Sequence, residues 1–375
     1  MLSAFAAGVA TPDWIDVLAA RTTGGLLRSY DVEGDSAFDR AHANCAYVYD
    51  NCVVGFALLR AGHVAQARVI GEALLAAQSR DRFYTDGRLR NAYAAGRVVA
   101  VGPYPLPGWY DQAAGKWLED GYQVGSATGV VAWGMLFWCA LARATGEARF
   151  TAAAGRAGDW VARMTRVTKG FAGGFTGWEP GPAPVGWVST EHNFDVSLAF
   201  AALGRGDMAA HAAAFVRAMW DNGEGRFCAG LTPAGVVNRQ TAADANLWPL
   251  LAPGAPADWG RALDWVVTRQ GVPAGAPQGI DFDGDRDGIW LEGTAYLALA
   301  AGRAGRAALA ATAMASLRAN TAPGGLVYAA SVPRLTTGLA TGLTGMADFY
   351  YYRRPHIAAT GWAAMAAQDV DPFNA

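Results

Sequence analysis

The sequence predicts an all-α protein, a closed (α/α)6 toroid of six inner and six outer helices that forms a single domain over residues 1–375. Three observations predict it: two helix types alternate along the chain, short turns join the helices of each pair, and long loops separate the pairs. Hydrophobic residues make up 52% of the chain and charged residues 17%, which indicates a large buried core rather than disorder.

The two helix types differ in how far their apolar surface extends. A helix that is apolar all round is expected to be buried, whereas an amphipathic helix borders solvent. The expected inner helices are Tyr47–Arg60, Gly125–Ala144, Glu191–Leu203, Ala242–Leu251, Leu291–Gly302 and His356–Ala367. The expected outer helices are Val64–Gln78, Ala148–Thr165, Met208–Trp220, Pro256–Thr268 and Arg306–Asn320, with Asp13–Arg28 as the sixth, beside the last inner helix. One helix hairpin cannot bury its own apolar face, so six of them predict a ring, with an open solenoid as the alternative.

The connections predict which end of the ring carries function. Links from inner to outer helices are short and contain glycine, whereas links from outer to inner helices are long and rich in Gly, Pro and aromatic residues. These long loops, which precede the inner helices, are Ser79–Val124, Arg166–Thr190, Asp221–Thr241, Gln270–Trp290 and Thr321–Pro355. Functional residues concentrate on loops held by a rigid scaffold, and the same end carries the positive ends of the inner-helix dipoles.

Acidic side chains recur at the starts of the inner helices. Each could be a helix cap without any chemistry, but Asp50 and Asp195 lie deeper in apolar helices, where an ionised group is costly to bury unless it is paired. Glu191 and Asp195 are four residues apart and share one helix face. If the ring closes, these acids converge on one axial pocket. We therefore expect the catalytic residues to be Glu191, Asp50, Asp244 and Glu292.

Further polar and aromatic residues at the same end are candidates for binding substrate. Flat rings suit the apolar faces of sugars, and carboxylates and amides suit their hydroxyls. A histidine in an apolar helix could instead be a core residue, and a tryptophan could simply fill space between helices. The expected binding residues are Tyr49, Trp109, Tyr110, Asp120, Trp187, His192, Asn193, Asp195, Asn246, Trp290, Arg354 and His356.

One acidic loop resembles a calcium-binding loop. Asp281, Asp283 and Asp285 alternate along the chain, and Glu292 stands at the twelfth position. The glycine expected at the sixth position is Arg286, so an acidic loop beside the substrate is favoured over calcium, and no metal or other cofactor is expected. The four cysteines have no metal-ligand spacing and are expected to be small buried apolar residues.

The overall charge excludes one class of partner. The net charge of −2 and pI near 6.2 provide no basic surface for nucleic acid.

No run approaches eighteen consecutive apolar residues, so no membrane span is expected. The first residues lack a basic region before their apolar stretch and do not predict an intact signal peptide. Location stays open: cytoplasmic for this sequence, periplasmic or secreted if a signal was removed.

Several motifs resemble those of the six-hairpin glycosidase superfamily. They are the Tyr49-Asp50 helix, the run Glu191-His192-Asn193-Phe194-Asp195, the run Trp290-Leu291-Glu292-Gly293-Thr294, and the closing helix after Arg354-Pro355-His356. The resemblance extends over nearly the whole chain in architecture, although the motifs are short. It implies a glycan-active toroid and supplies no catalytic assignments.

We therefore expect a glycoside hydrolase that acts on a bacterial polysaccharide or oligosaccharide. Such chemistry needs one protonated carboxyl group and one ionised carboxylate. Glu191 is the expected general acid, Asp50, Asp244 and Glu292 compete for the base role, and inversion is favoured. The alternatives are a lyase that uses His192 or a tyrosine with Arg353 or Arg354, an epimerase that uses His192 and His356, and a non-catalytic glycan-binding toroid.

Overall fold

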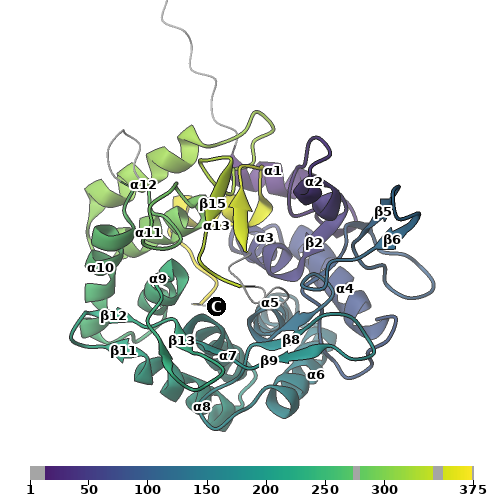
Figure 1. Cartoon of the computed structure of the whole chain (residues 1–375), viewed down its shortest axis with the longest axis horizontal. Helices are drawn as coiled ribbons and strands as arrows, with labels where there is room; N and C mark the ends of the chain where they lie inside the picture. Colours follow the sequence, from purple (N-terminus) through teal and green to yellow (C-terminus); the bar gives the residue numbers. More distant parts are fainter. Residues whose placement is uncertain (1–12, 273–278, 341–348, 374–375) are drawn as a thin grey trace, which may run out of the picture.

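The computed structural model describes residues 13–272, 279–340 and 349–373, which form a ring of helices around a central axis (Figure 1). The inner helices are α3 (Val48–Arg60), α5 (Thr128–Thr145), α7 (Thr190–Ala202), α9 (Ala243–Leu251), α11 (Leu291–Arg303) and α13 (Ile357–Ala367). The outer helices are α1 (Trp14–Arg21), α4 (Val64–Ser79), α6 (Ala148–Met164), α8 (Gly206–Ala218), α10 (Arg261–Gln270) and α12 (Ala307–Ala319). A short helix α2 (Ala37–His42) and a 3-10 turn η1 (Ala257–Gly260) complete the helical elements of the described residues.

The inner helices close into a ring, as the sequence predicts. Each contacts the next in the order α3, α5, α7, α9, α11 and α13, and α13 contacts α3 again. Each outer helix packs on its inner partner, and α1, the first helix of the chain, packs on α13, the last. The chain therefore forms an (α/α)6 toroid, and the open solenoid is excluded.

Short antiparallel strands lie in the long loops; some pairs form within one loop, and others, such as β7 with β8 and β10 with β13, join neighbouring repeats. The pairs are β1 (Gly25–Leu26) with β4 (Gly96–Arg97), β2 (Cys45–Tyr47) with β3 (Ala92–Ala94), β5 (Trp109–Asp111) with β6 (Lys116–Leu118), β11 (Trp220–Asp221) with β12 (Arg226–Phe227), and β15 (Arg334–Thr336) with β16 (Tyr350–Tyr352). One three-stranded sheet has the order β7 (Ser126–Ala127), β8 (Gly174–Thr176) and β9 (Ala183–Val185). The other has the order β10 (Val188–Ser189), β13 (Gly230–Leu231) and β14 (Val237–Asn238).

The first outer helix is shorter than predicted. It begins after the N-cap Asp13 but ends at Arg21 rather than Arg28. Gly24 adopts φ +127°, which ends the helical conformation. At Gly25 an added Cβ would lie 1.9 Å from the carbonyl oxygen of Gly96, so this close strand contact requires glycine. The amphipathic pattern was correct for the helix but continued into strand β1.

A repeated side-chain bracket fixes the start of the inner helices. In five repeats, the fourth residue after the N-cap accepts a hydrogen bond from a loop N–H and donates one to the carbonyl of the N-cap residue. Asn193, for example, accepts from the Phe171 N–H at 2.8 Å and donates to the carbonyls of Phe171 and Ser189. The equivalent residues are Asn51, Asn246, Thr294 and Thr360. These buried bonds hold the long loops against the helix starts, where the site lies.

Two further expectations concern the core. The cysteines Cys45, Cys52, Cys139 and Cys228 are all buried and unpaired. Helix α5 has the length and composition of a membrane span, but 72% of that stretch is buried as an inner helix of the ring. The segment examined for a signal peptide lies mostly outside the described residues.

Candidate active site

Two layers of side chains point toward the axis at the end where the inner helices begin. Residues two and six positions after each N-cap are four apart, so they share one helix face. The outer of the two layers contains Tyr49, Gly129, Glu191, Asp244, Glu292 and Ala358. The layer beneath it contains Val53, Trp133, Asp195, Trp248, Tyr296 and Trp362.

Aromatic contacts across the ring show that these layers meet on the axis. Trp133, Trp248 and Trp362 stand on α5, α9 and α13, which alternate around the ring, yet their ring centroids lie 5.4–6.1 Å apart. Phe373 packs against all three indoles, with ring centroids 5.8–6.0 Å apart. An aromatic floor therefore closes the axis below the acidic layer.

Glu191 and Asp244 form a carboxyl pair in the acidic layer. Burial raises the pKa of Glu191 well above its usual value, and the charges of Asp244, Asp195 and Glu292 raise it further. The protonated Glu191 donates a hydrogen bond to Asp244. Burial raises the pKa of Asp244 to about 6, although hydrogen bonds from the Ala245 N–H and Glu191 oppose the increase. These neighbours therefore favour the protonated form of Glu191.

Asp195 lies one helical turn below Glu191, in the aromatic floor. Burial first, and then the Asp244 charge, raise the pKa of Asp195 well above its usual value, while the nearby Trp133 indole lowers it. The Asp195 side chain is fully buried, and neither of its oxygens has a hydrogen-bond partner at normal distance. A buried carboxyl group without partners is costly when ionised, which favours the neutral acid here.

Glu292 lies in the same acidic layer with tyrosine partners. The hydroxyls of Tyr49 and Tyr296 both donate to its Oε1, and the Trp362 indole donates to the Tyr49 hydroxyl at 2.9 Å. Among the described residues, its second oxygen, Oε2, has no hydrogen-bond partner. Burial raises the pKa of Glu292 to about 7, although His356 and the two tyrosines oppose the increase. Glu292 can therefore gain or lose a proton near neutral pH, and one of its oxygens is free to do so.

A histidine–carboxylate pair borders this layer between α13 and α3. His356, the N-cap of α13, donates from Nε2 to Asp50 at 3.0 Å, and its Nδ1 lies 3.8 Å from Oε2 of Glu292. Burial lowers the pKa of His356, but Asp50 and Glu292 together raise it more, so the net change is upward. Tyr30 stacks on the imidazole at 4.3 Å and fixes its plane. The imidazole Nδ1 accepts from the Ala359 N–H at 3.4 Å, so the ring lies between the Asp50 and Glu292 carboxyl groups with Nε2 as the donor.

His192 has a different environment. It occupies the position in α7 that Asp50 occupies in α3, three residues after the N-cap, and this position faces the preceding inner helix. An added Cβ at Gly129 of α5 would lie 2.5 Å from the His192 ring, so the imidazole fills the space above that glycine. Burial lowers its pKa to about 4, and Nδ1 has no hydrogen-bond partner. Trp187 packs against the ring at 5.1 Å.

The remaining predicted residues lie around the acidic layer rather than within it. Asn193 and Asn246 belong to the repeated bracket. Asp120 accepts from the backbone N–H groups of Tyr122 and Gln123 in a turn. Arg354 donates two hydrogen bonds to Asp39. Trp290 is buried against Phe282, Tyr296 and Tyr351. Trp109 and Tyr110 lie on the β5–β6 hairpin at the edge of the ring (Figure 1).

Sequence reasoning missed several residues that shape the site. Tyr296 is the clearest case: it lies four residues after Glu292 on the same helix face, a spacing that could have revealed the contact. Trp133 is a second case: its indole packs on Trp248 and lies beside the Asp195 carboxyl group. Tyr351, on β16, was a candidate only for the lyase alternative; burial first, then the charges of Glu292, Tyr30, Asp244 and Glu191, raise the pKa of its phenol, which places it beside the acids. No spacing rule reveals that contact.

The acidic loop after α10 gathers its carboxylates closely. Asp281, Asp283 and Asp285 each offer one oxygen, and these oxygens lie within 4.8 Å of one another. Burial, followed by a hydrogen bond to Asp285, raises the pKa of Asp281 to about 8. Oxygen donors at this spacing suit a hard cation such as calcium. The sequence favours an acidic loop beside the substrate over a calcium site, and that expectation remains a prediction.

Comparison with known proteins provides a structural match only. No family model and no curated protein sequence matches the chain. A glycosidase solved in several variants, one in complex with glucose, aligns with a TM-score of 0.63 and 14% identity over 95% of this chain and 94% of that one. A sugar epimerase from a ruminal bacterium aligns with a TM-score of 0.65 and 12% identity over 96% and 97%. The cellobiose 2-epimerase of Bacillus thermoamylovorans B4167 aligns with a TM-score of 0.62 and 9% identity over 94% and 95%.

The chain has the six-hairpin fold. These proteins share its helical ring along almost their whole length, which confirms the predicted fold class. At such low identity the match says nothing about which reaction this chain performs.

Proposed function

We propose that the protein is a carbohydrate-active enzyme, specifically a glycoside hydrolase that acts on a polysaccharide or oligosaccharide. The observation that carries the proposal is the axial acid cluster, in which a protonated Glu191 and a titratable Glu292 share one layer. Glycoside hydrolysis requires such a pair of carboxyl groups with different proton affinities. The sugar-active proteins that share the fold support the same substrate class.

Glu191 is the proposed general acid. Its pKa is held high by burial and by the neighbouring Asp244, Asp195 and Glu292, so it carries a proton that it can give to the leaving oxygen. Asp244 lies within hydrogen-bond distance of Glu191. That is too close for the base on the opposite face of a sugar, because the two catalytic carboxyl groups of a hydrolase are about 5 Å or more apart. Asp244 is therefore assigned to holding the proton of Glu191.

Glu292 is the proposed base. Its Oε2 is unpaired and its pKa of about 7 allows it to accept a proton from water at neutral pH. Glu191 stands on α7 and Glu292 on α11, with α9 between them in the ring. The two acids are therefore not on neighbouring helices, an arrangement that suits the wider carboxyl spacing of an inverting mechanism. Asp50 competes for the base role, but one of its oxygens accepts from His356.

Sugar epimerisation is the second candidate, because two of the solved proteins with this fold are named sugar epimerases and His356 pairs with Asp50. A two-histidine mechanism also requires His192 as a proton acceptor. Its pKa of about 4 makes it a weak base, which favours the hydrolase. A lyase is supported least: Arg354 is bound to Asp39, and Arg353 donates to Asn320 and the Ser331 carbonyl.

The test is product analysis on a panel of polysaccharides and oligosaccharides in D2O, with Glu191→Gln as the key variant. A hydrolase releases reducing ends with one anomer first. Glu191→Gln is expected to lower that rate by about 10²–10⁴-fold, the usual contribution of a general acid. Glu147→Gln, at the start of an outer helix, is the matched control and is expected to keep full activity. Deuterium at a sugar carbon without new reducing ends would instead support the epimerase, and ultraviolet-absorbing unsaturated products would support the lyase.

A further inference from the structure

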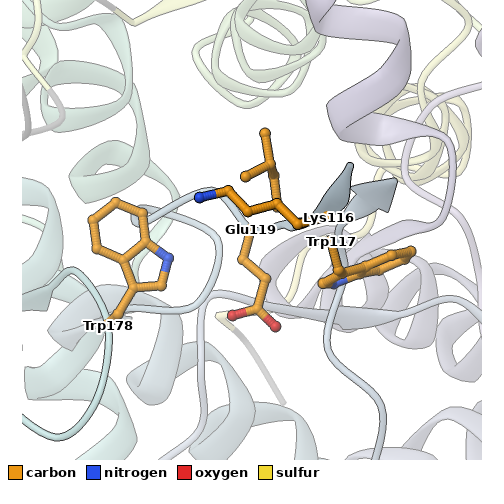
Figure 2. Close-up of a pocket in the computed structure, with 5 residues that line it drawn as sticks. Lys116, Trp117, Glu119 and Trp178 are labelled. Carbon is orange, nitrogen blue, oxygen red and sulfur yellow. The ribbon is translucent and has the colours of Figure 1, made fainter. Parts of the chain in front are cut away.

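A pocket of about 420 Å³ lies at the edge of the ring, away from the axial acids. It is lined by Lys116, Trp117, Leu118, Glu119 and Trp178, and we call it the indole cleft. Figure 2 shows Trp117 and Trp178 on opposite sides, with the Glu119 carboxylate between them. The two indoles are 51% and 49% exposed, whereas most large aromatic side chains of this protein are buried. Its volume is within the range of small-molecule sites.

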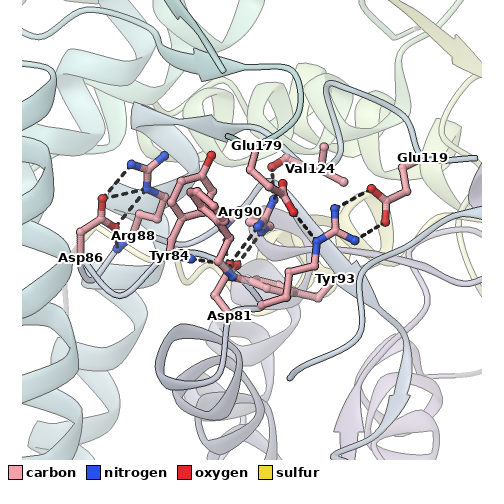
Figure 3. A network of polar contacts seen from close by, with 11 residues as sticks. Asp81, Tyr84, Asp86, Arg88, Arg90, Tyr93, Glu119, Val124 and Glu179 are labelled. Atoms are coloured by element: carbon pink, nitrogen blue, oxygen red, sulfur yellow. Dashed lines mark hydrogen bonds and ion pairs between the residues drawn. The ribbon is translucent and has the colours of Figure 1, made fainter. Parts of the chain in front are cut away.

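An ion network, exposed at Arg82 and buried at Arg90, fixes the two walls of the indole cleft relative to each other. Glu119, two residues after Trp117, accepts two hydrogen bonds from Arg82, and Arg82 also donates to Glu179, the residue after Trp178 (Figure 3). The fully buried Arg90 then joins Glu179 to Asp81. Two loops that are distant along the chain are thereby tied together, so the indoles are held apart before any ligand arrives. Pre-organised walls lower the entropic cost of binding.

Trp117 is also held from behind. An added Cβ at Gly108 would lie 2.5 Å from the Trp117 indole nitrogen, so the ring rests directly on backbone at a position that tolerates no side chain. Tyr110 lies opposite Trp117 in the β5–β6 register and is 53% exposed, which extends the aromatic surface along the hairpin. This apolar area is fixed in place and faces solvent.

The polar groups of the indole cleft suit hydroxyls rather than a charged ligand. The Glu119 carboxylate is neutralised by Arg82 but retains lone pairs that can accept further hydrogen bonds. The Lys116 ammonium group, which also lines the cleft, offers hydrogen-bond donors (Figure 2). Flat aromatic walls with balanced donors and acceptors match a neutral sugar ring, which has apolar faces and a polar edge.

The indole cleft is connected to the axial site by a short stretch of chain. Tyr122 follows Glu119 by three residues, and burial first, then the charges of Glu191 and Asp50, raise the pKa of its phenol. At no more than about 3.6 Å per residue, the Cα atoms of Glu119 and Tyr122 are within about 11 Å of each other. A ligand of several sugar units could therefore contact the indole cleft and the acid layer together.

We propose that the indole cleft is a second carbohydrate-binding site, which holds a neutral sugar unit of a polymeric substrate between Trp117 and Trp178. The inference rests on the proposed glycan activity of the axial site. The inference adds a substrate class to that proposed activity. The substrate is a neutral polysaccharide that is long enough to reach from the indole cleft to the axial carboxyl groups.

The test measures binding of soluble neutral polysaccharides by affinity gel electrophoresis: starch, dextran, xyloglucan, galactomannan and mixed-linkage glucan. Binding is measured with the full chain carrying Glu191→Gln, so that the polysaccharide is not hydrolysed during the experiment. Trp117→Ala and Trp178→Ala are each expected to weaken binding about tenfold or more, since truncating an anchoring tryptophan typically costs over 1 kcal/mol. Trp117→Phe keeps a ring and is expected to retain most binding. Phe83→Ala is the matched control, because Phe83 is 51% exposed but does not line the cleft.

The outcomes separate this inference from the proposed hydrolase. Tryptophan-dependent binding without any hydrolysis keeps the indole cleft and removes the hydrolase. Hydrolysis of polymers with unchanged binding in both tryptophan-to-alanine variants keeps the hydrolase and overturns the cleft. Binding restricted to acidic polysaccharides, or no binding to any polymer, also overturns it. Near-ultraviolet circular dichroism of each variant establishes that a loss of binding is not a loss of folding.

Discussion

The elevated pKa of Glu292 predicts that this residue makes the protein less stable as pH rises. Burial moves the pKa from 4.5 to about 7 in the folded protein. Between these values the native state binds more protons than the unfolded chain, so the free energy of unfolding falls as pH rises through that window. At about 1.36 kcal/mol per pH unit, the difference corresponds to roughly 3 kcal/mol once the pH exceeds 7.

Replacing Glu292 by glutamine should remove this penalty. The amide oxygen can still accept from Tyr49 and Tyr296, and the amide nitrogen can face the imidazole Nδ1 of His356. We expect urea unfolding at pH 8 to show Glu292→Gln more stable than the wild type by about 1–3 kcal/mol. At pH 4.5 the two proteins should be nearly equal, because the wild-type carboxyl is then protonated. Activity should be lost at both pH values.

A second variant, Tyr296→Phe, is expected to change the pH dependence of stability in the opposite direction. Tyr296 donates to Glu292 and lowers its pKa, so Tyr296→Phe should raise that pKa further and steepen the loss of stability between pH 5 and pH 8. Comparing each variant with the wild type at the same pH cancels contributions from other titrating groups such as Asp281. The reasoning is refuted if Glu292→Gln is no more stable than the wild type at pH 8, or if its advantage is the same at both pH values.

Two further predictions concern the framework of the site. Asn193→Ala leaves the Phe171 N–H and carbonyl buried without partners, so it should lower the free energy of unfolding in urea by about 2–4 kcal/mol. Asn193→Asp keeps the acceptor and should lower it less. Equal losses in the two variants would argue against the bracket. Gly129→Ala places a methyl group against the His192 ring and should cost about 1–3 kcal/mol. Histidine NMR should then show a shifted His192 signal and an unchanged His211 signal, and an unmoved His192 would contradict this packing.

The fold was predictable because hydrophobic periodicity carries it. The inner helices are apolar on all sides, and the structure begins each within about three residues of the predicted start. The outer helix α1 ended seven residues earlier than predicted, because Gly25 and Leu26 pair with the distant strand β4 instead of continuing the helix. A pattern within fifteen residues cannot report a contact made with residues seventy positions away.

The site was predictable as a set of residues but not as a set of pairs. Position relative to the helix start identified Glu191, Asp244 and Glu292, because repeats of one architecture place equivalent positions on the axis. Which acid donates to which depends on the ring's curvature and on side-chain conformers. The pairing of Glu191 with Asp244 and of Asp50 with His356 therefore required coordinates. Asn193 and Asn246 also occupy equivalent positions near their helix starts, yet their side-chain amides form hydrogen bonds with the long loops.

The aromatic floor explains why acids at these positions acquire different proton affinities. Indoles from α5, α9 and α13 fill the axis and exclude water below the acid layer, so each carboxyl must be stabilised by its own neighbours. Glu191 faces other carboxyl groups and keeps its proton, whereas Glu292 faces two phenols and a histidine and remains titratable near pH 7. The same desolvation that costs stability thus separates an acid from a base. A floor of smaller residues would admit water, bring the two pKa values together and weaken the division of roles.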